Sequence, residues 1–201
     1  MASIRALCKT GVLLENGSVK FTGSAEDTIV RYQASNVNSN GIALKDRKDK
    51  QGDQRIVVTN VVFRNEQGVS IDELFVGQPL IIDFQFEVKD ASIDLSKLII
   101  ACNFTDNFGN PLVIWCSDEM DQSFSCLMEG KVRLRVANMN LRPNIYTFNY
   151  QFSLSSTSPK DWCDSLSNVA HLTVLSEKTE NSSKIITRSG YSAILPAEFL
   201  V

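Results

Sequence analysis

Three acidic side chains lie close together in the sequence and could supply acid–base chemistry. Asp118, Glu119 and Asp121 fall within one short stretch, and glycosidases cleave their substrates with two carboxyl groups held about 5–10 Å apart. All three acids lie in the same polar loop, however, where solvated carboxylates are the usual finding. No Ser/His/Asp or Cys–His arrangement offers a nucleophile either. We therefore expect no catalytic residues in this chain.

Five cysteines and one histidine are the side chains that could bind a transition metal. They are scattered along the chain, with no C-x-x-C pair, at Cys8, Cys102, Cys116, Cys126, Cys163 and His171. A structural zinc site needs four such ligands at short spacings. We expect neither a metal nor another cofactor. The cysteines are expected to be small buried thiols in a reducing compartment rather than a disulfide framework.

The overall charge and hydropathy exclude several classes of partner. The 201 residues carry a formal net charge of −3 and 43% hydrophobic residues. A chain without a basic field has no electrostatic means of attracting nucleic acid. No apolar run approaches the roughly 20 residues that cross a bilayer, and the first residues lack the pattern of a signal peptide. These features predict a cytoplasmic protein with neither nucleic-acid binding nor direct membrane insertion.

The first 54 residues divide into a small structured region and a polar stretch. Short apolar strands at 12–14 and 19–21 flank an Asn16-Gly17 turn, and a capping-box pattern predicts a helix from Ser24. From residue 35 to 54, few apolar residues accompany dense mixed charge, a composition that cannot repay the entropy of ordering. We expect a solvated linker there, with a docking segment as the alternative.

The remainder alternates apolar and polar residues with the period of β-strands. Strands are expected at 56–63, 80–88, 98–104, 112–116, 131–136, 145–154 and 171–175. Seven short strands separated by turns predict an all-β fold, namely an immunoglobulin-like antiparallel β-sandwich. The last residues, from Ile185 to Leu200, are unusually apolar for a chain end. Such a segment either completes the sheet of its own protomer or pairs with a second chain.

Two groups of motifs resemble a known family. Residues 13–17 (LLENG), 21–23 (FTG) and 29–32 (IVRY) are similar to the end of the ATP-binding subunit of polysaccharide ABC exporters. Residues 106–111 (DNFGNP), 142–146 (RPNIY) and 161–164 (DWCD) resemble the C-terminal domain of the Wzt-type O-antigen exporters. Pro143-Asn144 replaces the family's usual Pro-Gly and keeps its turn chemistry. No G-x-x-x-x-G-K-[ST] phosphate loop occurs, so we expect the tail of a larger protein.

The resemblance implies a division into three regions and a set of partners. Residues 1–34 would be a short α/β remnant of the ABC ATPase domain, 35–54 the linker, and 55–201 a carbohydrate-binding β-sandwich. The family implies non-catalytic recognition of the exported O-antigen polysaccharide, often at its modified non-reducing end. It also implies a homodimer that exchanges its last strand. Through the missing ATPase domain, the chain would join a membrane-spanning exporter subunit and lie at the cytoplasmic side of the inner membrane.

The strand order places one candidate glycan surface. The strands at 98–104, 112–116, 145–154 and 171–175 would share a sheet, and its outer face is expected to carry one tryptophan among neutral polar groups: Trp115, Asn103, Asn149, Gln151, His171 and Thr173. An aromatic plane can stack on a sugar ring, and planar amides can bind its hydroxyl groups. The opposite sheet would present the mixed charges of Asp83, Gln85, Glu87, Lys131, Arg133 and Arg135 to solvent.

Two alternatives remain open at this stage. Trp115 could be covered by a loop or by the other protomer instead of stacking on a sugar. The whole sandwich could be a dimerisation or docking module of the exporter without direct glycan binding. Such a module would show a large apolar outer patch and no amide-lined groove.

Overall fold

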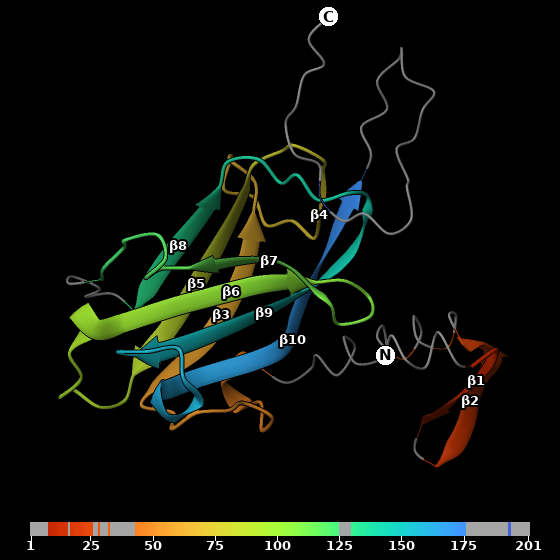
Figure 1. Cartoon of the computed structure of the whole chain (residues 1–201), viewed down its shortest axis with the longest axis horizontal. Helices are drawn as coiled ribbons and strands as arrows, with labels where there is room; N and C mark the ends of the chain where they lie inside the picture. Colours follow the sequence, from red (N-terminus) through yellow and green to blue (C-terminus); the bar gives the residue numbers. More distant parts are fainter. Residues whose placement is uncertain are drawn as a thin grey trace, which may run out of the picture.

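The strands between Ile56 and Leu175 form two β-sheets packed face to face (Figure 1), and two earlier strands form a separate two-stranded sheet. The computed structural model describes residues 8–15, 17–25, 28, 32, 43–124, 130–175 and 193. A five-stranded sheet has the order β4-β10-β9-β6-β7, and a three-stranded sheet has the order β3-β5-β8. Three short 3₁₀ turns lie among the described residues from 43 to 175: η1 (Leu44–Asp46), η2 (Leu95–Lys97) and η3 (Pro159–Asp161). The predicted all-β sandwich is confirmed.

The three-stranded sheet follows the sequence pattern closely. It contains β3 (Ile56–Arg64), β5 (Leu80–Val88) and β8 (Lys131–Val136). On its outer face, Asp83 accepts hydrogen bonds from the guanidinium groups of Arg133, at 2.6 Å, and Arg64, at 2.9 Å. The hydrogen bond from Arg133 is the main cause that lowers the pKa of Asp83. This face is a surface of paired charges, as predicted.

The five-stranded sheet contains the four strands that were expected to share a sheet, and one more. Its members are β4 (Glu73–Phe75), β6 (Leu98–Thr105), β7 (Pro111–Cys116), β9 (Asn144–Leu154) and β10 (Trp162–Leu175). Sequence reasoning missed β4, a three-residue strand that runs parallel to the end of β10. It also placed the start of the last strand at residue 171. The strand begins at Trp162, well before the expected start.

A bulge explains why β10 was hard to recognise. Leu166 pairs with Tyr150, and Ala170 pairs with Phe148, so residues 167–169 lie opposite the one residue Asn149. These additional residues break the alternation of the sequence. Asn168 has a φ of 55°, in the left-handed region that Asn accepts more readily than most residues. The polar Ser167-Asn168 pair therefore resembles a turn in the sequence but lies within a strand.

The core between the sheets is built largely from aromatic rings. Tyr146, Phe148, Tyr150 and Phe152 of β9 all point inward and are buried, as their alternation predicted. Phe148 meets Phe63 of the other sheet edge to face, with ring centroids 5.3 Å apart, and Phe84 lies 5.6 Å from Phe152. Such pairs contribute packing beyond their buried area. Cys102, Cys116 and Cys163 are buried free thiols, Cys8 is exposed, and Cys126 lies outside the described residues.

The N-terminal region contains the expected hairpin. β1 (Thr10–Glu15) pairs antiparallel with β2 (Ser18–Ser24), and Gly17 in the turn has a φ of 79°, a conformation that glycine adopts without steric cost. Ser24, the expected start of a helix, is the last residue of β2, and Ala25, Thr28 and Tyr32 are helical. The other residues of the predicted helix lie outside the described residues. The apolar C-terminal segment also lies outside the described residues, except Ala193, which pairs with Leu141.

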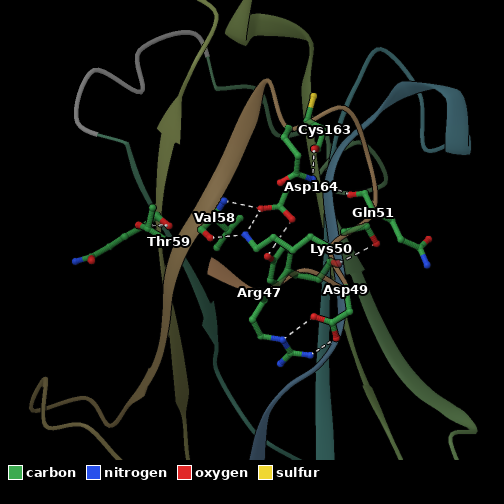
Figure 2. Close-up of polar contacts among 12 residues, drawn as sticks. Arg47, Asp49, Lys50, Gln51, Val58, Thr59, Cys163 and Asp164 are labelled. Atoms are coloured by element: carbon green, nitrogen blue, oxygen red, sulfur yellow. Dashed lines mark hydrogen bonds and ion pairs between the residues drawn. The ribbon is translucent and has the colours of Figure 1, made fainter. Parts of the chain in front are cut away.

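The end of the predicted linker is a packed part of the sandwich. Gln51 exchanges two backbone hydrogen bonds with Ser165 of β10, at 2.9 and 2.8 Å, and Lys50 is 4% exposed. Residues 35–42 lie outside the described residues, whereas residues 47–54 lie against β10 (Figure 2). The prediction of a solvated linker as far as residue 54 is therefore wrong for this last part. Arg47, Asp49 and Lys50 make specific bonds there, whereas Lys48 is exposed.

Lys50 and Asp164 form the centre of this packing (Figure 2). The Lys50 ammonium lies 2.6 Å from an Asp164 carboxylate oxygen and donates to the Val58 carbonyl at 2.7 Å. Asp164 is 0% exposed and also accepts from the Val58 N–H, at 2.7 Å, and the Tyr150 hydroxyl, at 3.2 Å. Because each charge is paired and hydrogen-bonded, the pair can be buried without leaving a polar atom unsatisfied.

Replacing Lys50 by methionine should destabilise the domain strongly. The change leaves the buried Asp164 carboxylate without its cation, a loss that typically costs about 3–5 kcal/mol. The matched control is Arg55→Met, which breaks the exposed ion pair with Asp53 and should cost about 1 kcal/mol or less. Urea unfolding of the full chain measures both values. Equal costs for the two variants would show that residues 47–54 do not stabilise the sandwich.

Candidate glycan-binding groove

The outer face of the five-stranded sheet brings together residues from four strands. Asn149 on β9 lies directly opposite Asn103 on β6, and Asn103 lies directly opposite Ile114 on β7. On the other side of Asn149 is the bulge of β10, residues 167–169. One row along, Gln151 lies between Ala101 and Ser165. Since directly paired residues point to the same side of a sheet, these side chains form one continuous surface.

A chain of hydrogen bonds fixes the orientation of the two asparagine amides. The backbone N–H of Asn168 donates to Asn149 Oδ1 at 2.9 Å, and Asn149 Nδ2 donates to Asn103 Oδ1 at 2.6 Å. A backbone N–H can only donate, so the group that faces it must be the oxygen of Asn149. The nitrogen of Asn149 then faces Asn103, whose oxygen must accept. The bulge thus fixes which end of each amide, oxygen or nitrogen, faces its neighbour.

These residues line a groove of about 440 Å³, which we call the amide groove. Its polar lining includes Asn103, Asn149, Gln151, Ser165, Ser167 and Asn168, and its apolar lining includes Ile114 and Pro111. None of the described lining residues is charged. A shallow, neutral groove with several amides and an exposed apolar side chain can bind hydroxylated, uncharged molecules.

Arg47 holds the bulge from the side. Its guanidinium donates to the carbonyl oxygens of Asn168, at 3.0 Å, and Ser167, at 3.4 Å. The same group donates to the Asp49 carboxylate, with one bond of 2.9 Å (Figure 2), and this bond is the main cause that lowers the pKa of Asp49. Two consecutive bulge carbonyls are therefore bonded to a group whose charge is already balanced. Arg47 is placed to keep the bulge in the shape that orients Asn149.

Not all predicted site residues lie in the amide groove. Asn103, Asn149 and Gln151 line it. His171 and Thr173 belong to the same sheet face but lie further along β10, where His171 Nδ1 is 3.3 Å from the Thr147 hydroxyl and Thr173 pairs with Ile145. Burial lowers the pKa of His171, so the neutral imidazole is favoured. These two residues do not contact the groove.

Trp115 points in the opposite direction from the predicted one. It pairs with Cys102, an inward-facing residue, and its ring meets Phe104 edge to face, with centroids 6.0 Å apart. It lines a small cleft of about 40 Å³ at the edge of the core, together with Met120 and Phe124. The prediction that Trp115 shares the outer face with Asn103 is therefore wrong. Residues 112–115 are all apolar, so this strand has no alternation that tells its two faces apart.

Sequence reasoning also missed several residues of the groove. Ile114 was overlooked in favour of Trp115, although it is 55% exposed. Ser165, Ser167 and Asn168 precede the position where the last strand was expected to start, and Arg47 lay in the predicted linker. The Ser167-Asn168 pair inside an otherwise apolar run was the available signal for the bulge.

Comparison with known proteins supports the fold and gives the family. The family model described as the Wzt C-terminal domain matches residues 47–186, a range that begins at Arg47. A solved structure titled the crystal structure of the C-terminal domain of wzt is 13% identical and covers 77% of this chain and 90% of its own, with a TM-score of 0.58. This likeness confirms the fold.

Other matches add no further argument. The soluble domain of PmoD from Methylocystis sp. ATCC 49242 (Rockwell) is 12% identical, with 61% of this chain and 93% of its own covered, and its TM-score of 0.31 is too low to support a shared fold. No curated protein matches the chain. Because the family model matches well over half of the residues and the sandwich agrees with it, the chain belongs to the Wzt C-terminal domain family.

Proposed function

We propose that this chain recognises the polysaccharide cargo of an ABC exporter, and that it does so at the amide groove. The observation that carries the proposal is the oriented pair of Asn103 and Asn149 beside the exposed Ile114, in a groove without charged lining residues among those described. Sugars offer hydroxyl groups in a ring plane and apolar C–H faces, which match amides and an aliphatic side chain. Membership of the Wzt C-terminal domain family supports this assignment.

The proposed role is selection of cargo rather than chemistry. Binding the polysaccharide, with its modified non-reducing end as the favoured epitope, would hold the finished polymer near the ATPase to which this domain would be attached. A membrane-spanning exporter subunit would be reached through that ATPase, at the cytoplasmic face of the inner membrane. Among the helices that the structure describes, none is both long and apolar enough to cross a bilayer.

A homodimer would strengthen weak binding at each groove. Each groove is shallow and hydrophilic, so the affinity per site should be low, and two grooves on one assembly would gain avidity when a repeating polymer reaches both. Strand exchange through the apolar C-terminal segment is the proposed route to the dimer, although that segment lies outside the described residues apart from Ala193. The alternative role, a dimerisation or docking module without glycan binding, makes no use of the oriented amides.

Titration with the O-polysaccharide of the source organism tests the proposed function. We expect backbone and amide NMR shifts to change at Asn103, Asn149 and Ile114, because these residues line the groove. The opposite sheet, represented by Gln85 and Lys131, should not respond. An unrelated polysaccharide is the control ligand. A folded protein that shows no shift with its own polysaccharide would be an assembly module instead.

Substitution of Asn149 by alanine should weaken polysaccharide binding about tenfold or more. The variant removes one amide from the groove and releases the orientation of Asn103, which together should cost about one to two hydrogen bonds, or roughly 1.5–3 kcal/mol. Gln85→Ala removes an exposed amide from the other sheet and should leave the affinity unchanged. Calorimetric titration measures both. Identical affinities for the two variants would exclude the groove as the glycan site.

Replacing Arg47 by glutamine should loosen the bulge, because the charged hydrogen bonds from the guanidinium to the bulge carbonyls are lost. Glycan binding should weaken about threefold to tenfold, which is less than the effect of Asn149→Ala. Amide hydrogen exchange at Asn168 should accelerate, because its bond to Asn149 depends on the bulge geometry. The exposed neighbour Lys48→Gln is the matched control. Unchanged exchange at Asn168 in Arg47→Gln would show that Arg47 does not position the groove.

A further inference from the structure

We propose that the amide groove selects a sugar that carries an acetyl group. In this proposal, Asn103 Nδ2 donates to the acetyl carbonyl oxygen, and the acetyl methyl packs on Ile114. The proposal deepens the glycan-binding function and rests on it, because it names the chemical group that the same site reads. The choice of an acetyl group depends on which atoms of the groove amides are already hydrogen-bonded within the protein.

The hydrogen-bond chain leaves Asn103 as a donor. The N–H of Asn168 holds Asn149 Oδ1, and Asn149 Nδ2 holds Asn103 Oδ1. Asn103 therefore turns its oxygen toward Asn149, and its NH₂ group is the end that can serve a ligand. No hydrogen bond from Asn103 Nδ2 to another described residue competes for this position. The matching group on the ligand must be an acceptor.

The amide of Gln151, one row away, is oriented the other way, with its nitrogen bonded within the protein and its oxygen free for a ligand. Its Nε2 group donates to the Thr157 carbonyl at 3.2 Å and lies 3.5 Å from the Ser153 hydroxyl. Its oxygen is the end left for a ligand, and it suits the hydroxyl donors of a sugar ring. A hydroxyl group can thus be bound at Gln151, whereas the position of Asn103 is best filled by a group that only accepts.

Ile114 decides which acceptor fits. It lies directly across from Asn103 on β7 and is 55% exposed, and the Cβ atoms of directly opposed residues are about 5 Å apart. An acetyl group joins a carbonyl oxygen and a methyl to the same carbon, so one substituent can reach both side chains. A plain hydroxyl would satisfy Asn103 but leave Ile114 in water.

Anionic acceptors fit this position less well. A carboxylate or phosphate would lose hydration in a groove whose described lining residues include no cation, and that loss is large when no charge compensates it. The nearby guanidinium of Arg47 is already paired with Asp49 and with the bulge carbonyls. The neutral carbonyl of an acetamido or O-acetyl substituent meets the same donor without this cost.

Two trisaccharides that differ in this group provide the test. Triacetylchitotriose carries an acetamido group at C2 of each ring, where cellotriose carries a hydroxyl, and the other hydroxyl groups and the linkages are the same. We expect the full chain to bind triacetylchitotriose at the amide groove about tenfold more tightly than cellotriose, because the methyl contacts Ile114 and because a carbonyl accepts more strongly from Asn103 than a hydroxyl does. NMR titration gives both affinities and locates the binding face.

Asn103→Asp is the decisive variant. The carboxylate keeps an oxygen to accept from Asn149 Nδ2 but cannot donate to a carbonyl, so the preference for the acetylated trisaccharide should disappear. Ile114→Thr keeps a β-branched side chain and should reduce the preference severalfold. Asn60→Asp, an exposed position on β3 of the other sheet, makes the same charge change away from the groove and should retain the full preference.

The outcomes separate this inference from the proposed function. A preference that is absent in the unchanged protein, or that survives in Asn103→Asp, overturns acetyl recognition. If the source polysaccharide still shifts Asn103 and Asn149 in that case, glycan binding at the groove stands without it. If neither trisaccharide nor the source polysaccharide perturbs the groove, both the acetyl proposal and the glycan function are refuted.

Discussion

The buried carboxylate of Asp164 is the constraint on which the arrangement depends. A charge in this position needs a cation and several donors, and the chain meets that need from three places: Lys50 before the first sandwich strand, Val58 on the three-stranded sheet, and Tyr150 on β9. Both sheets and the segment 47–54 are thereby joined at one point. The same pairing brings Arg47 beside β10, where it bonds the carbonyls of Ser167 and Asn168.

The groove follows from this local geometry. Three residues of β10 face one residue of β9, and the left-handed Asn168 turns its N–H toward the side chain of Asn149. One backbone donor is therefore enough to set the polarity of Asn149 and, through it, of Asn103. Amides that are oriented before a ligand arrives lose less freedom on binding. The bulge of β10 is thus the part of the sheet that orients the groove amides for binding.

The sequence was sufficient for the sandwich and for half of the candidate site. Strands such as β5 and β9 alternate over most of their length, so their inward faces and approximate bounds could be predicted from the period alone. Trp115 could not be oriented, because residues 112–115 are uniformly apolar, and β10 was shortened because its bulge resembles a turn. Lys50 was assigned to solvent by its charged neighbours. A buried ion pair joins residues 114 positions apart, and composition within a short window cannot reveal such a contact.

A crystal structure of the full chain grown with an oligosaccharide of the source polysaccharide would show where the ligand binds and which atoms hold it. We expect sugar density over β6, β7 and β9, with an acceptor atom within hydrogen-bonding distance of Asn103 Nδ2 and the bulge at Asn168 unchanged. Density over the charged face of β3, β5 and β8, or in the cleft beside Trp115, would contradict this expectation.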